Sequence, residues 1–477
     1  MSVKKTYPTS PTPGKQLSSK KPNAKKQRGN WLLIGLGLTA VSLVSAMAGA
    51  FLSISFSATP LRQSSLTPGQ EKVFSRDSTI AYKNLRLPEL SRPVNLLVLG
   101  TKVLSSEVNE KPKEDLGYHA LVNSFKGLSD TMVLLRFDPS QDKLRLLSIP
   151  RDTQANIGRG IRKINEANYY GGAALAAEAV STLLGGVPVD RYVRVNIQGV
   201  EKVIDALGGV NVYVPKNMKY TDHSQHLYID LKQGKQHLDG ERAIAFLRFR
   251  YDRYGDIGRV QRQQMLMRAV VEQALRPQTV LKMPEILSVI GTYIDTNLTV
   301  EELVALAGFA AQTRRSNVEM LMVPGGFSGD GKQKVSYWIP YPHKIREMVA
   351  DYFDHGNYQD FENKNPTRLR IAIQDSVEDP KAVKAMVNYL RERGYGRVFV
   401  SDNWGEPLTT TRIVAQQGDD LGAASLKATL RVGEVLVEST GTLSSDITII
   451  LGRDWQQQYP SFESPTAENF LQTQHNN

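Results

Sequence analysis

A long, mostly apolar run, WLLIGLGLTAVSLVSAMAGAFLSISF at residues 31–56, limits what this chain can fold into more than any other feature. No charged residue lies between Arg28 and Arg62. A helix needs about 20 apolar residues to cross the hydrocarbon core of a bilayer, and this run is long enough. The rival interpretation is a cleaved signal peptide, whose apolar region is usually shorter, about 7–15 residues. We therefore expect an uncleaved transmembrane helix at 31–56.

The basic charge of the chain is concentrated before this run. The formal net charge is +11, but residues 1–30 contain Lys and Arg without any Asp or Glu, so the rest of the chain is nearer to neutral. That distribution argues against nucleic acid as a partner. Basic residues before a span predict a cytoplasmic N-terminus. We expect a single-pass protein of the cell membrane with a disordered basic tail at 1–30 and its body outside the cytoplasm, on the periplasmic or cell-wall side.

The first folded body is expected at 91–355, after a juxtamembrane linker at 57–90. The segments DTMVLLRFDP and KLRLLSIPRD alternate apolar and polar residues around a turn-like PSQD, which predicts an antiparallel hairpin. Helices and strands then alternate with short links, which indicates an α/β sandwich with a central mixed sheet flanked by helices. The other expected strands are 94–100, 191–197, 210–215 and 318–324, and the expected helices are 164–185, 199–209, 239–249 and 259–275.

A second, smaller body is expected at 367–453, after a linker at 356–366. Its strands and helices follow the order βαββαβ, which is typical of a compact α/β domain. The strands are expected within 368–376, 395–402, 410–416 and 446–452, and the helices within 379–394 and 422–432. Residues 454–477 are rich in Gln, Pro and Ser and are expected to be disordered.

Charged residues lie at one end of the predicted hairpin. Asp130 begins the first strand in GLSDTM, and Arg151 and Asp152 end the second in SIPRDT. The hairpin places Asp130 and Arg151 at the same end of neighbouring strands, and Lys163 follows in the next loop. Because a strand end followed by an irregular loop is a common place for a functional site, we expect these residues to form one.

The segment LRFRYDRYGDIGRVQRQQ, at 247–264, is rich in arginine. Arg259 and Gln263 are four residues apart on one face of a predicted helix. Arg248 and Arg250 lie where the preceding helix ends, and they reach the same volume if the loop between the helices turns the chain back. The guanidinium fork suits phosphate because it donates paired hydrogen bonds and stays charged, and a pyrophosphate needs several such groups.

Two interpretations of this cluster remain open on the residues alone. In the first, the arginines bind pyrophosphate and nearby carboxylates hold Mg²⁺, a hard cation that bridges phosphates. Asp130 is then the leading ligand, and Asp152 or Asp256 comes next. In the second, the arginines form surface ion pairs with Asp252 and Asp256. Taken with the hairpin residues, the pattern favours a functional site.

The same stretches carry a family resemblance. The blocks VNLLVLG, GLSDTM, LLSIPRDT, KINEANYYGG, VDRYVRVNIQGVEKVIDALGGVNVYVP, LDGERAIAFLRFR and GDIGRVQRQQ occur in this order within residues 94–353. In sequence and order they resemble the LytR–CpsA–Psr family of cell-envelope proteins. Residues 367–453 are similar, more loosely, to the LytR C-terminal domain. The anchor helix fits the resemblance as well, because family members are commonly single-span membrane proteins.

The resemblance implies a phosphotransferase that takes a glycopolymer from a polyprenyl-pyrophosphate carrier and joins it to a sugar hydroxyl of peptidoglycan by a phosphodiester. By resemblance, Arg151 would contact the pyrophosphate, and Asp130 would hold Mg²⁺. Asp130 or Asp152 would orient or deprotonate the acceptor hydroxyl. The family also has a tunnel for the prenyl chain, for which 175–195 and 265–271 are candidate linings, although ordinary core is favoured for any single residue there. The resemblance assigns the pyrophosphate pocket to Lys163, Arg248, Arg250, Arg259 and Gln263.

Two positions depart from the family pattern. Family members often have Asp after the first strand and Arg before SD, where this chain has Lys102 and Leu128. Lys102 or Lys126 could supply compensating charge, and Asp115 could supply a carboxylate. The Mg²⁺ site is therefore less secure than the arginine site.

The transferase interpretation has three alternatives. A pyrophosphatase acting on the same lipid would use water as the acceptor. A non-catalytic envelope scaffold that binds peptidoglycan is favoured by Lys102. A DNA-binding regulator is opposed by the predicted span and the near-neutral body. In every case Arg253 and Arg262 fall outside the pyrophosphate positions, and we expect them to be surface or ion-pair residues.

Overall fold

The protein is seen here in a computed structural model that describes most of the chain after the apolar run. The chain forms two compact units, Met1–Ala58 and Thr59–Asn477, and every described residue belongs to the second. Within this part, no helix is long and apolar enough to cross a membrane. The predicted transmembrane helix and basic tail lie outside the described residues. These are 63–75, 77–81, 88–102, 124–223, 227–249, 256–328, 336–356, 368–416, 418–442 and 444–458.

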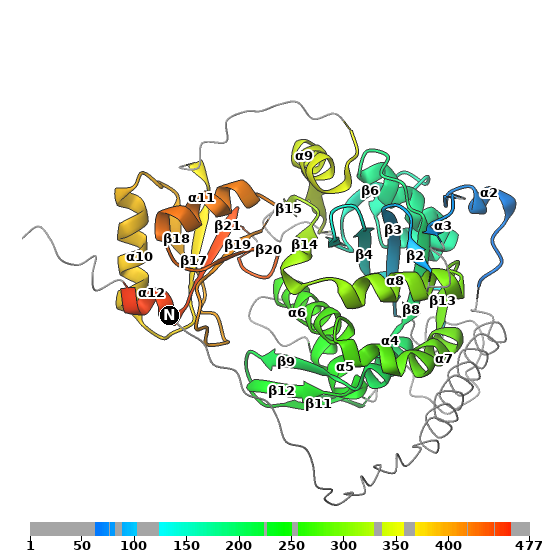
Figure 1. Cartoon of the computed structure of the whole chain (residues 1–477), viewed down its shortest axis with the longest axis horizontal. Helices are drawn as coiled ribbons and strands as arrows, with labels where there is room; N and C mark the ends of the chain where they lie inside the picture. Colours follow the sequence, from blue (N-terminus) through cyan, green and yellow to red (C-terminus); the bar gives the residue numbers. More distant parts are fainter. Residues whose placement is uncertain are drawn as a thin grey trace, which may run out of the picture. The chain divides into compact units, whose positions relative to one another are not determined.

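A six-stranded mixed sheet forms the centre of the larger domain (Figure 1). Its strand order is β13–β8–β3–β4–β5–β14, in which β4 pairs antiparallel with β3 and β5. The β3–β8 and β5–β14 pairs are parallel. The predicted hairpin is therefore confirmed as β4–β5. The strands are β3 Val94–Thr101, β4 Ser129–Asp138, β5 Lys143–Ile149, β8 Arg191–Asn196, β13 Ile294–Thr296 and β14 Val318–Met322.

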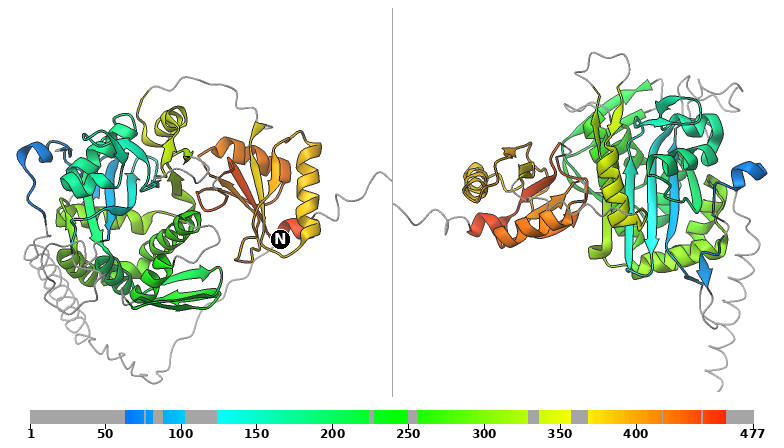
Figure 2. Two further views of the ribbon diagram at one scale, coloured as in Figure 1. Left: turned by 180° about the vertical axis from the view of Figure 1, so that it is seen from behind. Right: turned by 90° about the horizontal axis from the view of Figure 1, so that it is seen from above.

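Helices cover both faces of this sheet, as the alternation of its strand residues requires. Leu97, Leu134 and Leu147 point to one face and pack with α3 and α9. Leu96 and Val133 point to the other face and pack with α6 and α8. The predicted α/β sandwich is thus confirmed, and Figure 2 shows the same elements from behind and from above. These helices are α3 Glu166–Leu183, α6 Asp256–Ala274, α8 Val300–Gln312 and α9 Pro342–Phe353.

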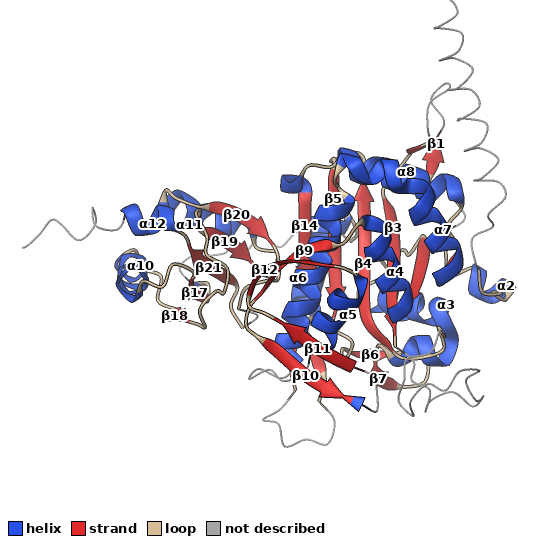
Figure 3. Cartoon of the chain, turned by 90° about the horizontal axis from the view of Figure 1, so that it is seen from below, coloured by secondary structure: helices blue, strands red, loops and turns tan. Residues whose placement is uncertain are grey.

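Further helices and two β-ribbons extend the α6 side of the domain (Figure 3). Helix α4 begins after Asn196, whose side chain accepts a hydrogen bond from the Gly199 N–H, and it ends at Gly208 in the left-handed region at φ +85°. The predicted N-cap Asp239 is confirmed at α5, where it accepts from the Arg242 N–H. The ribbons are the antiparallel pairs β9–β12 and β10–β11, of which only β9 was predicted. The bounds are α4 Ile197–Leu207, β9 Val210–Val214, β10 Met218–Asp222, β11 Leu227–Leu231, β12 Gly234–Leu238, α5 Gly240–Arg248 and α7 Met283–Tyr293.

Several short helices and strands lie at the edges of the domain. The pair β6–β7 follows the end of β5, and the pair β15–β16 follows β14. Both pairs matter for the site described below. The short elements are α2 Pro68–Glu71, β1 Ile80–Ala81, β2 Glu89–Leu90, β6 Gln154–Asn156, β7 Ile161–Lys163, η3 Pro277–Lys282, η4 Arg315–Asn317, β15 Gly325–Phe327 and β16 Trp338–Pro340.

The smaller C-terminal domain is a five-stranded sheet in the order β18–β17–β21–β19–β20, with α10 and α11 packed in one hydrophobic cluster against it. The predicted βαββαβ order is incomplete, because β20 adds a strand between α11 and β21. The predicted disorder from 454 is also wrong at its start, because α12 continues to Gln458 and buries Trp455. The bounds are β17 Ile371–Asp375, α10 Pro380–Glu392, β18 Val398–Val400, β19 Arg412–Ala415, α11 Asp420–Leu430, β20 Glu434–Val437, β21 Ile447–Leu451 and α12 Arg453–Gln458.

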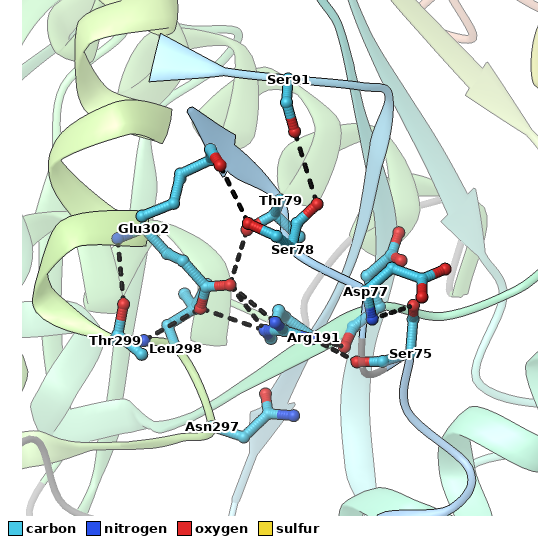
Figure 4. A network of polar contacts seen from close by, with 12 residues as sticks. Ser75, Asp77, Ser78, Thr79, Ser91, Arg191, Asn297, Leu298, Thr299 and Glu302 are labelled. Atoms are coloured by element: carbon cyan, nitrogen blue, oxygen red, sulfur yellow. Dashed lines mark hydrogen bonds and ion pairs between the residues drawn. The ribbon is translucent and has the colours of Figure 1, made fainter. Parts of the chain in front are cut away.

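A buried carboxylate fastens the segment before β3 to the larger domain (Figure 4). Glu302 on α8 accepts hydrogen bonds from the Arg191 guanidinium at 2.7 and 3.0 Å and from the Thr79 hydroxyl at 2.6 Å. It also accepts from the Thr299 N–H, which closes the capping box of α8. Arg191 in turn donates to the Ser75 carbonyl. Burial alone would raise the pKa of Glu302, but the hydrogen bonds from Arg191 and Thr79 outweigh it and hold the pKa below its usual value.

The change Glu302→Ala is expected to lower the free energy of unfolding by about 3 kcal/mol at pH 7, because it leaves the Arg191 guanidinium without its buried partner. The folded-state pKa of Glu302 is depressed, so its stabilisation is present above the unfolded pKa of about 4.3 and is lost as the pH falls through the folded value. Urea unfolding at pH 7 and at pH 3 measures this. The matched control is Glu301→Ala at the exposed neighbouring position, with an expected change below 0.5 kcal/mol. If the free energies of unfolding of Glu302→Ala and Glu301→Ala differ by the same amount at pH 7 and at pH 3, the role assigned to Glu302 is contradicted.

Candidate active site

The charged residues at the open end of the hairpin meet as predicted. The Arg151 guanidinium donates from Nη1 to Asp130 Oδ1 at 2.9 Å and from Nε to Asp152 Oδ2 at 3.3 Å. The three side chains remain partly open to solvent, with 30% of Arg151 and 19% of each carboxylate exposed. The site therefore presents a cation between two carboxylates in a position that a ligand can reach.

Lys163 joins this cluster through the β6–β7 ribbon. Gln154, soon after the Arg151 turn, pairs with Lys163 across the ribbon, so the chain doubles back toward β5. The Lys163 ammonium then donates to Asp152 Oδ1 at 2.7 Å. Asp152 consequently bridges Arg151 and Lys163 and holds both cations at one end of the sheet.

The turn that follows Lys163 ties the two strand ends together. The N–H of Asn165 donates to the Arg151 carbonyl, and the Asn165 carbonyl accepts from the Ser129 N–H, each at 3.2 Å. One turn further on, the buried Asn168 amide donates to the carbonyls of Phe125 at 3.1 Å and Gly127 at 2.8 Å. These hydrogen bonds fix the backbone segments that carry Asp130 and Arg151. The available signal in KINEAN was Asn168, which acts through its side chain.

The first of two hollows at this end of the sheet, the Arg151 hollow, has a volume of 60 Å³. Its polar lining includes Asp130, Arg151 and Asp152, and α6 contributes Gln263. The β15–β16 ribbon closes another side, where Trp338 donates its backbone N–H to the Asp152 carbonyl at 2.9 Å. The remaining lining residues are Thr131, Met132, Val133, Ser148, Ile149, Pro150, Gln264, Met267, Met322 and Phe327.

The second hollow, the Lys102 hollow, has a volume of 120 Å³ and two chemically different parts. Its polar part contains Lys102, Asp130, Asn196, Arg248 and Gln263. Its apolar part lies between β8, α4, α5 and β11. Both hollows share Asp130, Thr131 and Gln263, so they meet at that point. The apolar lining consists mainly of Val195, Ile197, Val200, Leu227, Ile244 and Leu247.

The arginine-rich segment is only partly described. Arg248 lines the Lys102 hollow and Gln263 lines both hollows, which agrees with the prediction that these positions converge. Arg250 and Arg253 lie outside the described residues. Arg259 lies in α6, but its side chain is outside the described part, and the same holds for Asp256.

The prediction for Arg262 was wrong. Only 2% of this residue is exposed, and its Nη2 donates to the Phe249 carbonyl at 2.5 Å while the guanidinium lies 5.7 Å from the centre of the Phe249 ring. Arg262 therefore connects α6 to the end of α5 inside the domain. This contact helps to fix the Arg248 end of α5 relative to Gln263.

The residues predicted as candidate linings of a prenyl tunnel lie partly in the hydrophobic core and partly at the two hollows. Most apolar residues of 175–195, such as Ala176 and Val180, are buried in the core between α3 and the sheet, as favoured for any single residue. Val195 at the end of that range lines the Lys102 hollow. Within 265–271, Met267 is half-buried and lines the Arg151 hollow.

The two carboxylates beside Arg151 are the described groups that could hold Mg²⁺. No three His, Cys, Asp or Glu side chains come together among the residues the structure describes. Asp130 and Asp152 both pair with Arg151, and Lys102 lines the same hollow as Asp130. Mg²⁺ is usually bound through one or two carboxylates together with several waters and substrate phosphates, so Asp130 and Asp152 could hold it beside a pyrophosphate. Asp115, the other predicted carboxylate, lies outside the described residues.

Comparison with known proteins gives matches to curated relatives and to solved structures. TagU of Oceanobacillus iheyensis, named a polyisoprenyl-teichoic acid–peptidoglycan teichoic acid transferase, is 33% identical over 48% of this chain and 71% of its own length. TagV of Bacillus subtilis, with the same activity in its name, is 30% identical over 48% of this chain, which spans only 61% of that relative. The crystal structure of B. subtilis TagV matches 56% of this chain and 99% of its own at 26% identity, with a TM-score of 0.46. A structure described as TagT bound to LI-WTA matches 58% of this chain and 96% of its own at 24% identity, with a TM-score of 0.42.

Two family models match the chain. Residues 64–352 match the LytR_cpsA_psr family, and residues 368–455 match the model described as LytR cell envelope-related transcriptional attenuator. The first match covers more than half of the chain and contains all the site residues described above. The chain belongs to the LytR_cpsA_psr family and carries a LytR-type C-terminal domain.

Proposed function

We propose that this chain transfers a glycopolymer from a polyprenyl-pyrophosphate carrier to a hydroxyl group of peptidoglycan, forming a phosphodiester during cell-wall assembly. The observation that carries the proposal is the Lys102 hollow, which places an apolar wall beside Lys102, Arg248 and Gln263. A prenyl pyrophosphate has the same division into an apolar chain and an anionic head. The transferase activity in the names of TagU and TagV supports this assignment.

The pyrophosphate belongs where the two hollows meet, at Asp130 and Gln263. Arg151 and Arg248 then face it from different strands and helices, so they neutralise charge on more than one phosphate oxygen. Phosphoryl transfer requires positioning and charge neutralisation more than covalent participation by the protein. The guanidinium of Arg151, held in place by Asp130 and Asp152, is preorganised for that role.

The reaction follows from this placement. The acceptor hydroxyl oxygen attacks the phosphorus that bears the glycan, and the bond from that phosphorus to the bridging oxygen breaks. Polyprenyl phosphate leaves with the electron pair of the broken bond. Asp130 or Asp152 accepts the hydroxyl proton, since both carboxylates line the Arg151 hollow. Asp130, with Asp152 beside it, would hold Mg²⁺, which would help to neutralise charge on the phosphate oxygens.

The location of the chain is part of the proposal. The apolar run at 31–56 anchors the chain in the cell membrane, and the basic residues at 1–30 keep its N-terminus in the cytoplasm. The catalytic body then lies outside the cytoplasm, on the side where peptidoglycan is found. A lipid carrier in the same membrane reaches this body without leaving the bilayer.

Acceptor dependence distinguishes the transferase from a pyrophosphatase and from a scaffold. The full chain in lipid vesicles is supplied with a polyprenyl-pyrophosphate glycan, and released polyprenyl phosphate is measured at increasing concentrations of peptidoglycan. A transferase releases the lipid in proportion to acceptor and attaches the glycan to it. Release that is independent of acceptor would indicate a pyrophosphatase, and the absence of release with every divalent metal tested would indicate a scaffold.

A further inference from the structure

Four exposed side chains gather near the Arg151 hollow, and we call them the Tyr169 patch. Ile161, Tyr169 and Tyr170 are 66%, 62% and 37% exposed. The guanidinium of the exposed Arg159 lies 4.9 Å from the centre of the Tyr170 ring. The β6–β7 ribbon, with Arg159 in its turn, contacts α3, which carries the two tyrosines (Figure 3). An exposed apolar patch with a polar rim is typical of a surface that binds a partner or a membrane.

A kink in α3 keeps the two tyrosines out of the hydrophobic core. Gly172 has φ +67° and ψ −156°, a conformation outside the helical region that glycine adopts without steric cost. Helix α3 therefore changes direction after its first turns, and the alanines that follow pack against the sheet. The Tyr169 and Tyr170 rings meet edge to face, with their centres 5.2 Å apart. The backbone thus presents both rings at the surface.

The Tyr169 patch has a fixed position relative to the active site. Tyr169 directly follows Asn168, whose amide holds two carbonyls of the loop before Asp130. On the ribbon, Ile161 lies two residues before Lys163, whose ammonium belongs to the charged cluster of the site. The patch therefore lies at the same end of the sheet as the proposed catalytic residues.

The chain also joins the body close to this patch. The Ser64 hydroxyl accepts from Arg194 Nη2 at 2.8 Å. Nη1 of the same guanidinium donates at 3.4 Å to Asn168 Oδ1, one residue before Tyr169. The proposed span ends at Phe56, and the eight residues from there to Ser64 reach at most about 29 Å when fully extended. Proposed anchoring therefore keeps this end of the body close to the bilayer.

We infer that the Tyr169 patch docks the active-site end of the body on the surface of the lipid bilayer. The inference rests on the proposed function, including its membrane anchor, and adds a second contact with the membrane. Tyrosine suits this surface because its ring is apolar and its hydroxyl stays in water. Arg159 adds attraction to anionic headgroups. A carrier whose prenyl chain remains in the bilayer has its pyrophosphate at the surface, where a docked body receives it directly.

The first test measures the depth of a label in the patch. The chain contains no cysteine, so one introduced cysteine is the only site for a thiol-reactive fluorophore. Ile161→Cys is labelled in the full chain, in vesicles of phosphatidylcholine and phosphatidylglycerol whose lipids carry quenchers at known depths. The label is expected about 5–10 Å inside the boundary between headgroups and acyl chains. Adding Tyr169→Ser and Tyr170→Ser should return it to water.

A matched control places the same label elsewhere on the body. Thr182→Cys lies at an exposed position in the last turn of α3, near the opposite end of that helix from the tyrosines. Its label is expected to stay in water with or without the tyrosine changes. Thermal unfolding of each variant verifies that it is folded.

The second test uses transfer kinetics to separate docking from a structural role. In the Tyr169→Ser, Tyr170→Ser double variant, KM for a long-chain carrier in vesicles should rise about tenfold, because the apolar contact is lost, while kcat is unchanged. With a short-chain, water-soluble pyrophosphate glycan, the same variant should match the wild type, because no bilayer takes part. Tyr169→Phe with Tyr170→Phe should keep most of the effect of the wild-type rings.

Several outcomes overturn the inference and leave the transferase intact. One is a label at position 161 that stays in water. Another is a double variant that loses activity equally with both carriers, which would indicate a structural role. A rise in KM for peptidoglycan in place of the carrier would make the patch a contact for the acceptor glycan. A wild type that transfers neither carrier's glycan removes the proposed transferase, whereas the depth of the label still decides whether the patch docks on the membrane.

Discussion

Replacing Arg151 with alanine is expected to lower the rate of glycan transfer by about a thousandfold or more. Arginines that stabilise transferring phosphoryl groups contribute about 10³–10⁵ in rate. Arg151 lies between Asp130 and Asp152 and lines the hollow proposed for the pyrophosphate. Its loss removes that charge and leaves two carboxylates facing the phosphates, so both kcat and kcat/KM should fall. Single-turnover transfer of a labelled glycan from the lipid carrier measures the effect.

Two matched variants separate the role of Arg151 from a general loss of charge. Arg162→Ala removes a guanidinium from the neighbouring β6–β7 ribbon. The Arg162 side chain is 44% exposed and pairs with Glu166. Because surface ion pairs contribute little, this change should alter the rate less than threefold. Arg151→Lys keeps the charge but loses the planar fork, so it should recover only part of the activity. The account is contradicted if Arg151→Ala remains within tenfold of the wild-type rate while the protein stays folded.

Replacing Asp138 with alanine is expected to lower the free energy of unfolding by about 4 kcal/mol. The fully buried carboxylate lies 3.2 Å from the Arg145 guanidinium and 3.6 Å from that of Arg136, which are themselves 2% and 5% exposed. It also accepts from the Ser140 and Gln141 N–H groups in the turn between β4 and β5. Removing it takes one of the two described carboxylate partners from each buried arginine and opens the turn of the hairpin that carries the site.

Urea unfolding at pH 7 measures this effect against Asp230→Ala, which removes a carboxylate that is 62% exposed and pairs with a surface lysine. The control should change the unfolding free energy by less than 0.5 kcal/mol. Burial raises the pKa of Asp138, but the Ser140 and arginine contacts outweigh it and hold the pKa below its usual value. The stabilisation is therefore present above the unfolded pKa of about 3.9 and is lost in acid. A loss below 1 kcal/mol in Asp138→Ala at pH 7 would show that the buried arginines do not depend on it.

The parts of the fold that the sequence predicts well are those set by local pattern. The β4–β5 hairpin follows from apolar alternation on both sides of PSQD, and its geometry alone brings Asp130 within 2.9 Å of Arg151. Helix α5, which ends at Arg248, is predicted by its N-cap Asp239 and by the apolar face of the helix. The strand β20 was missed because it has only four residues and none of them is buried, so neither length nor alternation marks it.

The parts that the sequence could not predict depend on tertiary contacts. Arg262 has the charge of a surface residue, and only the packing of α6 against the end of α5 shows that its guanidinium is used on the Phe249 carbonyl. Asn165 acts through its backbone, so its side chain gives little sign of its role. Lys102 and Arg248 line the same hollow, and only the fold shows this. The two residues lie too far apart in the sequence for their spacing to predict that they meet.

The most direct measurement follows the two phosphorus atoms of the lipid carrier separately. Polyprenyl-pyrophosphate glycan is prepared with ³²P in either the glycan-side or the lipid-side phosphate and is incubated with the full chain and peptidoglycan in vesicles. The account predicts that the glycan-side label enters peptidoglycan together with the glycan, that the lipid-side label leaves as polyprenyl phosphate, and that both events require Arg151. Glycan-side label that is released to water, or that remains on the lipid while the protein is folded and acceptor is present, would contradict the account.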